Sequence, residues 1–581
     1  MSKSALWAVP LVFAMASHAA TIRVPADSPT IQAGIDASVS GDTVLVAPGT
    51  YEGVGNYGIL NRGRGIALLS EGGPEVTVLK GDEPNHIITC TAVEGEDDLE
   101  IAGFTMSGGK SQYGSGIAIW NFTTTTTVRN CILSENESVN YGVLYVGSST
   151  AIIENCVLSS NVEGGSSAIW INEYNNGGPS DVTMTGCKIV DNEGQAGGVV
   201  CHSSSLRMSE CEISRNTASD RAQGAGVRLL YATDVSIENC TLAGNSGGYG
   251  GGLYATYCDM VTLEDCAITG NDALAHFGGG IVVDNSGYSL TRCTISDNEA
   301  GSNSGGFRSA DSDGVITNCV ISGNRAGEGG GLLCIGSNTE IMNCTITGNS
   351  AVSRGGGLYS YDDAKPIITN SILWANDPSQ VEGRGPVVTF CDVEGGFEGE
   401  GNIEWDPQLM DLAGGDYHLS SGSPCIDAGT SHGAPDTDYE GDERPQGRGF
   451  DIGADEALAA CDLAVELSDY PATIARGSRL VFRASAVNDC DDPLTLDQAV
   501  LSVAGPARLE ISLYDGAPIP IRKSAGTDVK LSVPPTAPLG TYAITVTIYR
   551  DGGAIDSESF DVSVVDEAPP RGSYGSRPGP F

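Results

Sequence analysis

The sequence predicts an all-β protein in which most of the chain winds into a parallel β-solenoid and a small β-sandwich follows. Three observations predict this class. A nine-residue pattern built around a cysteine recurs through the middle of the chain. Glycine supplies 79 of 581 residues, whereas charged residues are only 18%, a composition that excludes a helical bundle or a coiled coil. The last hundred residues change to short β-runs that lack the pattern.

Residues 1–20 read as an export signal. Lys3 gives a positive start, Ala5 to Ala16 form an apolar stretch, and small residues precede Ala20. We therefore expect an exported protein that is extracellular, at the cell surface or periplasmic. No later run has the roughly 18 apolar residues that a membrane span needs, so we expect no membrane insertion.

Residues 21–378 are predicted to form the solenoid, beginning with a cap over its first coil. Thr30 or Ser28 can cap a short amphipathic helix that carries Ile31, Ile35 and Val39. Val44 to Val46 are then expected to begin the first strand. Such a cap would cover an open β-edge, which otherwise recruits other chains.

The repeat follows the cap, and the nine residues IENCTLAGN (237–245) are a typical copy of its recurring pattern. Phe104 and Ser371 take the cysteine's place in a first and a last copy, so eleven copies follow one another at spacings of 24 to 31 residues. Nine copies carry the cysteine itself: Cys131, Cys156, Cys187, Cys211, Cys240, Cys266, Cys293, Cys319 and Cys344.

Each copy reads as two short strands that meet at a corner. Apolar residues alternate on both sides of a three-residue step, and the residue before the cysteine is Asn in six copies and Gly in two, types that tolerate a left-handed backbone. A second Asn recurs five places after the cysteine, and a glycine turn with a third β-run completes the copy. Stacked coils would bury the apolar and cysteine rows and let the Asn amides bond from coil to coil.

The ladder cysteines are interpreted as small buried hydrophobes rather than disulfides. Neighbouring coils hold Cβ atoms near the strand spacing, which is wider than a disulfide prefers. Elsewhere, Cys461 with Cys490 is the best disulfide candidate, and Cys391 with Cys425 is the weaker one.

These motifs resemble the pectin-lyase-like superfamily of right-handed parallel β-helix proteins. The opening TIQAGIDASVSGDTVLVAPGTY looks like the start of many secreted bacterial members, and ISGNRAGEGGGLLC resembles the repeats of chlamydial polymorphic outer-membrane proteins. The resemblance covers residues 21 to about 400. It implies a right-handed β-helix of about eleven regular coils plus irregular end coils, but the superfamily includes lyases, hydrolases, epimerases and adhesins.

Residues 379–456 resemble the closing segment that follows β-helices in proteins with interchangeable C-terminal anchors. We expect a polar cap over the last coil, in which Arg444 pairs with Asp427 or Asp451. The alternating acids Asp436, Asp438, Glu440 and Asp442 offer a weak calcium-loop alternative that lacks the closing Glu of an EF-hand. No cofactor is required by this interpretation, although calcium is possible.

Residues 461–566 contain seven β-runs and resemble an immunoglobulin-like or fibronectin-type sandwich. Such modules act as spacers or docking units. Residues 567–581 are rich in proline and glycine and are expected to be disordered.

The net charge of the chain narrows the classes of partner that it can bind. Lys and Arg total 30 and Asp and Glu total 74, a formal net charge of −44 that repels nucleic acid and anionic membranes. Acidic glycans meet the same repulsion unless a cation or a basic patch intervenes, whereas neutral glycans do not. A polysaccharide or cell-surface glycan is therefore the expected partner.

Outward positions after the glycine turns give the candidate binding face. Alternation points eight aromatic or charged side chains outward: Trp120, His202, Arg228, Tyr254, Asp284, Arg308, Tyr359 and Tyr361. Asp284 and Arg308 are the weak catalytic candidates because they fall on consecutive coils, whereas His202 lies three coils from Asp284. We expect an exported, non-catalytic β-helix for adhesion or glycan binding; the alternative is a polysaccharide lyase, hydrolase or epimerase.

Overall fold

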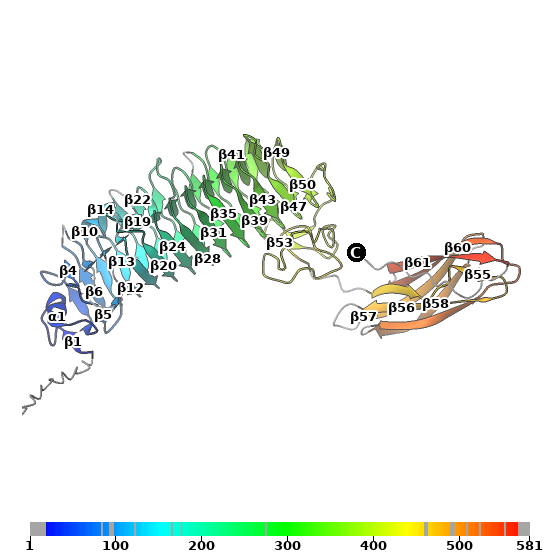
Figure 1. Cartoon of the computed structure of the whole chain (residues 1–581), viewed down its shortest axis with the longest axis horizontal. Helices are drawn as coiled ribbons and strands as arrows, with labels where there is room; N and C mark the ends of the chain where they lie inside the picture. The colour runs from blue at the N-terminus through cyan, green and yellow to red at the C-terminus, as the bar shows by residue number, and fades with distance from the viewer. Residues whose placement is uncertain are drawn as a thin grey trace, which may run out of the picture. The chain divides into compact units, whose positions relative to one another are not determined.

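A computed structural model describes residues 19–566 except 83–84, 92–97, 121–123, 164–166, 176, 274–275, 458–462, 489–493, 507–508, 522–523 and 551–552. The chain divides into two compact units, 1–457 and 458–581. The first is a parallel β-solenoid and the second a small β-sheet unit (Figure 1). The export signal, the Cys461–Cys490 pair and the tail 567–581 lie outside the described residues, apart from Ala19 and Ala20.

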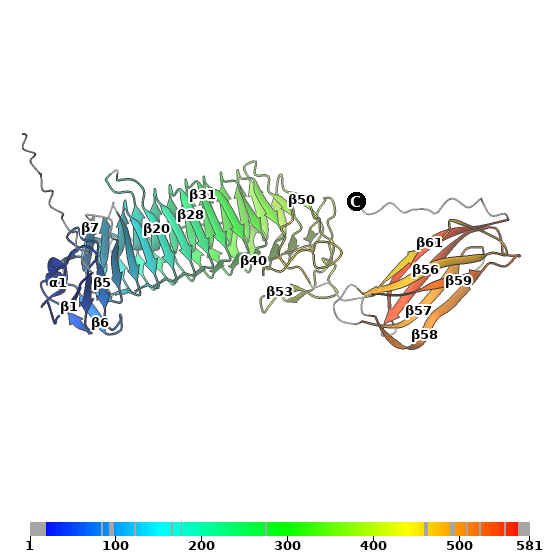
Figure 2. The same cartoon turned by 60° about the horizontal axis from the view of Figure 1, so that its bottom comes forward.

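The solenoid is built from three long parallel sheets to which each coil adds one strand. In one regular coil these strands are β28 (Asp234–Glu238), β29 (Thr241–Ala243) and β30 (Leu253–Thr256). They belong to sheets of 15, 14 and 13 strands respectively, in which successive coils pair in register. The strands of successive coils stack along the solenoid (Figure 2). The all-β solenoid predicted from the repeat is confirmed, and it extends beyond the eleven cysteine-type copies.

The extra coils at the ends lack the repeat signature. The 15-stranded sheet runs from β1 (Thr21–Val24) and β2 (Thr43–Val46) to β50 (Val387–Thr389), and the 14-stranded sheet from β3 (Gly49–Tyr51) to β51 (Asp392–Val393). Short strands flank the long sheets: β10 (Lys110–Tyr113), β14 (Glu137–Tyr141), β18 (Val162–Glu163), β22 (Glu193–Gly194) and β26 (Thr217–Ala218) form one such sheet. A second contains β33 (Asp272–Ala273), β37 (Glu299–Ala300), β41 (Arg325–Glu328) and β45 (Ser350–Arg354).

The 13-stranded sheet is given in full because its outer face carries the candidate site. Its strands are β4 (Ile59–Leu60), β7 (Ile88–Thr91), β11 (Ile117–Trp120), β15 (Leu144–Gly147), β19 (Ser167–Asn172), β23 (Gly197–His202), β27 (Val227–Leu230), β30, β34 (Ile281–Asp284), β38 (Phe307–Ala310), β42 (Leu332–Ile335), β46 (Leu358–Tyr361) and β49 (Val381–Gly383).

The N-terminal cap contains the expected helix, α1 (Ile31–Ala37), whose first turn is capped when Thr30 Oγ1 accepts from Ala33 N at 3.2 Å. Two details of the prediction were wrong. Val39 lies beyond the helix and is 58% exposed, because the helix ends at Ala37. The first strand is β1, which precedes the helix in the sequence and pairs in parallel with β2, the strand that follows the helix.

The corner before each cysteine has a left-handed backbone in all eleven copies. Asn239 is typical, with φ +52°, and even Glu210 and Arg292 adopt this conformation where Asn or Gly would cost less. The nine ladder cysteines are all buried and free. Adjacent coils bring them into contact, as when Cys293 N donates to Cys319 Sγ at 3.3 Å.

The second Asn, which the ten copies after the first contain, forms a continuous buried ladder, and this confirms the expected coil-to-coil bonding. In each link an Asn side-chain amide donates to the next Asn Oδ1, as from Asn245 to Asn271 at 3.0 Å, and the backbone N–H donates to the same oxygen. The ladder runs from Asn136 to Asn376, where Gln380 Oε1 accepts the last pair of bonds. The glycine turn next to the ladder leaves no room for a side chain. A Cβ on Gly252 would lie 2.6 Å from Gly280 O and 3.1 Å from Asn271 Nδ2.

The closing segment folds back over the outer face of the 14-stranded sheet. It contributes β52 (Leu409–Asp411) and β53 (Asp416–Leu419), and Leu419, Cys425 and Ile452 pack with Ile372 of the solenoid. Corner asparagines hold its backbone: Asn343 Nδ2 donates to Asp451 O at 3.3 Å.

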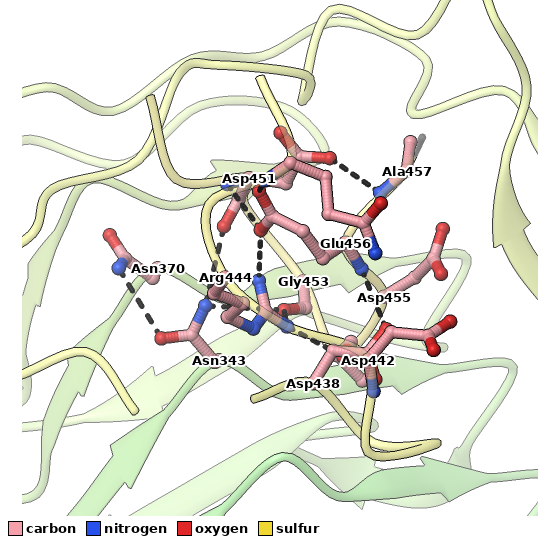
Figure 3. Close-up of polar contacts among 12 residues, drawn as sticks. Asn343, Asn370, Asp438, Asp442, Arg444, Asp451, Gly453, Asp455, Glu456 and Ala457 are labelled. Carbon is pink, nitrogen blue, oxygen red and sulfur yellow. Dashed lines mark hydrogen bonds and ion pairs between the residues drawn. The ribbon is translucent and has the colours of Figure 1, made fainter. Parts of the chain in front are cut away.

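Arg444 is the buried centre of this segment, but its partner was predicted wrongly. Figure 3 shows its guanidinium beside Glu456, which it contacts at 2.7 Å, and beside the carbonyl of Gly453 at 3.0 Å. Asp427 and Asp451 instead accept backbone N–H groups, from Gly449 and Ala457 among others. These carboxylates shape turns, so they are not free to pair with Arg444.

The weaker disulfide candidate was also wrong. Cys391 and Cys425 are both free, and Cys425 Sγ instead donates to Asp392 Oδ2 at 3.2 Å.

The second unit folds as two sheets around one core. One sheet contains β54 (Leu463–Ser468), β56 (Arg479–Asn488) and β59 (Ser524–Ser532). The other contains β55 (Thr473–Ala475), β57 (Leu494–Ala504), β58 (Leu509–Ile521), β60 (Gly540–Arg550) and β61 (Gly553–Val565). Phe482 from the first sheet and Ile544 from the second are buried in the shared core.

Candidate functional site

The outer face of the 13-stranded sheet displays its side chains in two columns. Strand alternation places Ile281 and Val283 of β34 in the core and turns Val282 and Asp284 to the outer face, where neighbouring residues cover Val282. Because successive strands pair in register, Arg228, Tyr254 and Arg308 fall in one column. His202 and Asp284 fall in the other, three coils apart as expected.

One group of side chains on this face, which we call the arginine network, is joined by hydrogen bonds and an ion pair. Its members are Gln223, Arg228, Tyr254, Asp284 and Arg308. Arg228 donates to Gln223 at 3.0 Å, Gln223 Nε2 donates to the Tyr254 hydroxyl at 3.2 Å, and that hydroxyl donates to Asp284 at 3.3 Å. Arg308 forms an ion pair with Asp284 and lies 4.3 Å over the Phe277 ring.

Burial governs the electrostatics of this network. The side chains of Asp284 and Arg308 are only 15% and 12% exposed, and burial raises the pKa of Asp284 despite the neighbouring guanidinium. Burial also lowers the pKa of Arg228 and raises that of Tyr254 to about 12. Tyr254 was expected to be an exposed outward ring, but its neighbours cover it to 6% exposure.

A second group, which we call the aromatic cluster, lies over β11, β15 and β19. Each of its rings has its centroid within 6.5 Å of another ring in the group: His86, Tyr113, Trp120, Tyr141, Tyr145, Trp170 and Tyr174. Tyr113 and Tyr141 are register partners on β10 and β14 and stack at 4.7 Å, a distance set by the coil repeat. Trp120 is the member that the sequence had singled out.

The remaining predicted residues lie apart from these groups. The His202 ring contacts Tyr231 at 5.8 Å, and burial lowers its pKa. Tyr359 and Tyr361 contact each other at 5.4 Å beside a polar cleft of about 540 Å³ that Arg354 and Glu382 also line. Tyr359 is 7% exposed because Arg354 packs over its ring and bonds to its hydroxyl at 2.9 Å.

The four acids offered for calcium do not converge. Asp438 is buried and its Oδ1 accepts the N–H groups of Glu440, Gly441 and Asp442. Glu440 points instead to His418 Nε2 at 2.9 Å, and together with Asp416 it raises the pKa of His418 to about 9. Throughout the described ranges, no group of three or more His, Cys, Asp or Glu side chains is placed to hold a metal ion.

Sequence reasoning missed most of the aromatic cluster. Tyr145 and Trp170 occupy the same outward position in their strands as Tyr254, and all three fall in one register column. They were overlooked because the glycine that directly precedes the apolar run in the predicted coils is replaced by Val143 and Ala168 in theirs. The alternation alone would have identified both residues, whereas Tyr113 and Tyr141 come from the flanking sheet and carry no such signal.

The described part of the chain contains no helix with the length and apolar character needed to cross a lipid bilayer. Among curated proteins, none matches this chain significantly. Two solved structures are similar in a limited way: the CARDB domain of PF1109 from Pyrococcus furiosus, in solution and as a crystal structure in complex with di-metal ions. Both are 17% identical over 18% of this chain and 96% of that domain, with TM-scores of 0.15 and 0.14, and this likeness carries no argument.

The comparison that agrees with the geometry is the one with a family model. The model described as "Right handed beta helix region" matches residues 115–287 and again 279–395. Those segments include every strand from β13 (Ile132–Ser134) to β50, and thus most of the regular coils. The solenoid is therefore a right-handed β-helix, and the candidate site lies on the outer face of one of its sheets.

Proposed function

We propose that the protein is an exported, non-catalytic β-helix that binds glycans on the outer face of its 13-stranded sheet. The observation that carries the proposal is the concentration, on one face, of aromatic rings and hydrogen-bonding side chains held by neighbouring coils. Aromatic faces and orienting polar groups are what a sugar-binding surface needs. The leader-like residues 1–20 support export to a compartment where such glycans occur.

The charges on this face favour binding over turnover. Arg308 is held in an ion pair with Asp284, and a guanidinium is a poor base. Within the described residues no trio of acids stands ready to bind a catalytic cation. The pairing of each charged group with a neighbour instead suits a preorganised recognition surface.

A glycan array with the chain from residue 21 onward tests binding. Polygalacturonate and alginate, each with and without calcium, test turnover through unsaturated products and new reducing ends. We expect retention of at least one glycan class and no product. Product formation would overturn the non-catalytic assignment, and an array without any bound glycan would overturn the binding face itself.

The second candidate is a polysaccharide lyase, hydrolase or epimerase. It is favoured by one observation, the placement of Asp284 between Arg308 and the Tyr254 hydroxyl on one face, where burial raises the pKa of the carboxyl in the direction that acid catalysis requires. Asp284→Asn would abolish product formation under this reading. Glu340→Gln, an exposed carboxylate on the 15-stranded sheet, is the matched control.

A further inference from the structure

We propose that the aromatic cluster is a subsite for an uncharged saccharide. This inference rests on the proposed glycan-binding function and assigns the neutral part of the ligand to β11, β15 and β19. The arginine network lies two strands further along the same sheet, beyond β23, so a chain that follows the rod axis can contact both groups.

The cluster is built around Tyr145, whose ring forms its floor. Trp120 and Asn172 flank this ring, and Gly147 lies in their column between them. A Cβ on Gly147 would lie 2.7 Å from the Tyr145 ring, so only glycine leaves the space in which the ring lies. The Tyr145 hydroxyl consequently points between the flanking side chains, and the residue is fully buried.

The rim of the cluster is half-buried and remains in contact with solvent. Tyr113 and Trp120 lie 5.3 and 5.6 Å from the Tyr145 ring, and Tyr174 lies 6.5 Å from it. Tyr174 is held in place because its backbone N–H donates to Ser148 Oγ at 2.7 Å. The rings on the rim thus present apolar surface of the kind that stacks on a pyranose ring.

Hydrogen-bonding capacity inside the cluster is only partly used. The Tyr145 hydroxyl lies beside the Trp120 and Asn172 side chains, which act on it. Even so, within the described residues four buried atoms have no partner in good hydrogen-bond geometry: Trp120 Nε1, Tyr145 Oη, Trp170 Nε1 and Asn172 Oδ1. Buried polar atoms are normally paired, and unpaired ones in a cluster point to a ligand. Two ring N–H donors, a hydroxyl and a carbonyl acceptor match the alternating donors and acceptors of a sugar's hydroxyl groups. Small rearrangements of the rim side chains, which are common on binding, would expose these four buried atoms to a ligand.

The chemistry of the cluster selects an uncharged ligand. The unpaired atoms belong to neutral side chains, and the nearest flanking charges on the short sheet, Lys110 and Glu137, pair with each other at 2.8 Å. A carboxylate sugar would find no counter-ion in the cluster and would be repelled by a chain of formal net charge −44. Acidic sugars would instead depend on the arginine network.

The test measures the affinity of the mature chain for cellohexaose, xylohexaose, mannohexaose and hexagalacturonate by calorimetry and by tryptophan emission. We expect at least one neutral hexasaccharide to bind, and Trp120→Ala to weaken it by about tenfold or more, since buried aromatic anchors dominate such contacts. Trp120→Phe keeps a ring and should lose less. Trp405→Ala, at a tryptophan that is 65% exposed in the closing segment, is the matched control and should change nothing.

The outcomes separate this inference from the proposed function. Binding of hexagalacturonate alone, lost in Arg308→Ala but retained in Trp120→Ala, would overturn the neutral subsite and leave the glycan-binding face standing. Failure of every probe and of the array would overturn both. An unchanged thermal midpoint in Trp120→Ala would show that its loss of affinity does not arise from misfolding. If that variant unfolds, Tyr174→Ala, on the half-buried rim, should show the same loss with an unchanged midpoint.

Discussion

The regular coils and the closing segment are stabilised in opposite ways. A coil relies on repetition, because Asn245 bonds to the same kind of residue on both sides and each coil adds one more link. The closing segment relies on contacts that occur once, centred on the buried pair of Arg444 and Glu456. The comparison teaches that stability in the coils is distributed over many equivalent contacts, whereas in the closing segment it is concentrated in a few buried charges.

The sharpest test of this contrast removes Arg444. Arg444→Ala leaves Glu456 buried without its cation, and breaking a buried pair in this way costs about 3 to 5 kcal/mol. We expect the closing segment to detach at lower urea while the coils persist. Emission from Trp374, which packs against this segment, reports the first step, and far-ultraviolet circular dichroism reports the second. The exposed Arg448→Ala is the control, and equal midpoints for both variants would contradict the prediction.

The next effect is a pH dependence that is largest in the closing segment. Burial raises the pKa of Asp451 to about 7 and those of Asp455 and Asp392 to about 6, above their values in an unfolded chain. The folded form therefore binds protons more tightly, so stability rises as pH falls from 8 towards 5, by roughly 2 to 4 kcal/mol. His418 acts in the same direction, because its raised pKa gives stability that is present below pH 6.5 and lost towards pH 9.

Thermal midpoints of the Trp374 signal at pH 5, 6, 7 and 8 measure this dependence. Asp451→Asn should flatten the curve, and Asp436→Asn, at an exposed acid in the same segment, should leave it unchanged. A midpoint that falls on acidification in this range would be the opposite of what the buried carboxyls require.

A smaller loss is expected in the coils. Asn245→Ala removes the acceptor used by the N–H and amide of Asn216 and leaves Ile213 O without its donor, at a cost of about 2 to 3 kcal/mol. Asn239→Gly, at an exposed corner of the same coil with φ +52°, should be nearly neutral. Chemical denaturation followed by circular dichroism measures both, and a larger loss for Asn239→Gly would reverse our assignment of the two asparagine rows.

The smallest effect concerns the thiols. The fifteen described cysteines are free and buried, and burial raises the pKa of Cys90 and Cys391 to about 12. We expect reductant to shift the unfolding of the solenoid by less than about 0.5 kcal/mol, and iodoacetamide at pH 8 to label these thiols only after unfolding. Rapid native labelling, located by mass spectrometry within the solenoid, would show that the coils open more readily than their packing allows.

The sequence could predict the repeated contacts of the coils but not the contacts that occur once in the closing segment. Repetition made the coils, the left-handed corners and the Asn ladder predictable, because each contact is between equivalent residues one copy apart. The partner of Arg444 was not predictable, since Glu456 competes with several nearby acids and only packing decides between them. The outward column was predicted for Arg308 and Asp284 but not for Tyr145, because the glycine turn was taken as its marker.

The Asn-to-Asn bonds of the ladder have a direction, since each of them is donated towards the C-terminal coil and Gln380 supplies the final acceptor. A duplicated or deleted copy inside the ladder leaves each remaining amide with a neighbour of the same kind. The rod can therefore change length during evolution by unequal recombination within its interior. Growth of the ladder beyond Asn376 is different, because a new Asn there must first displace Gln380, although the sheets themselves continue to β51.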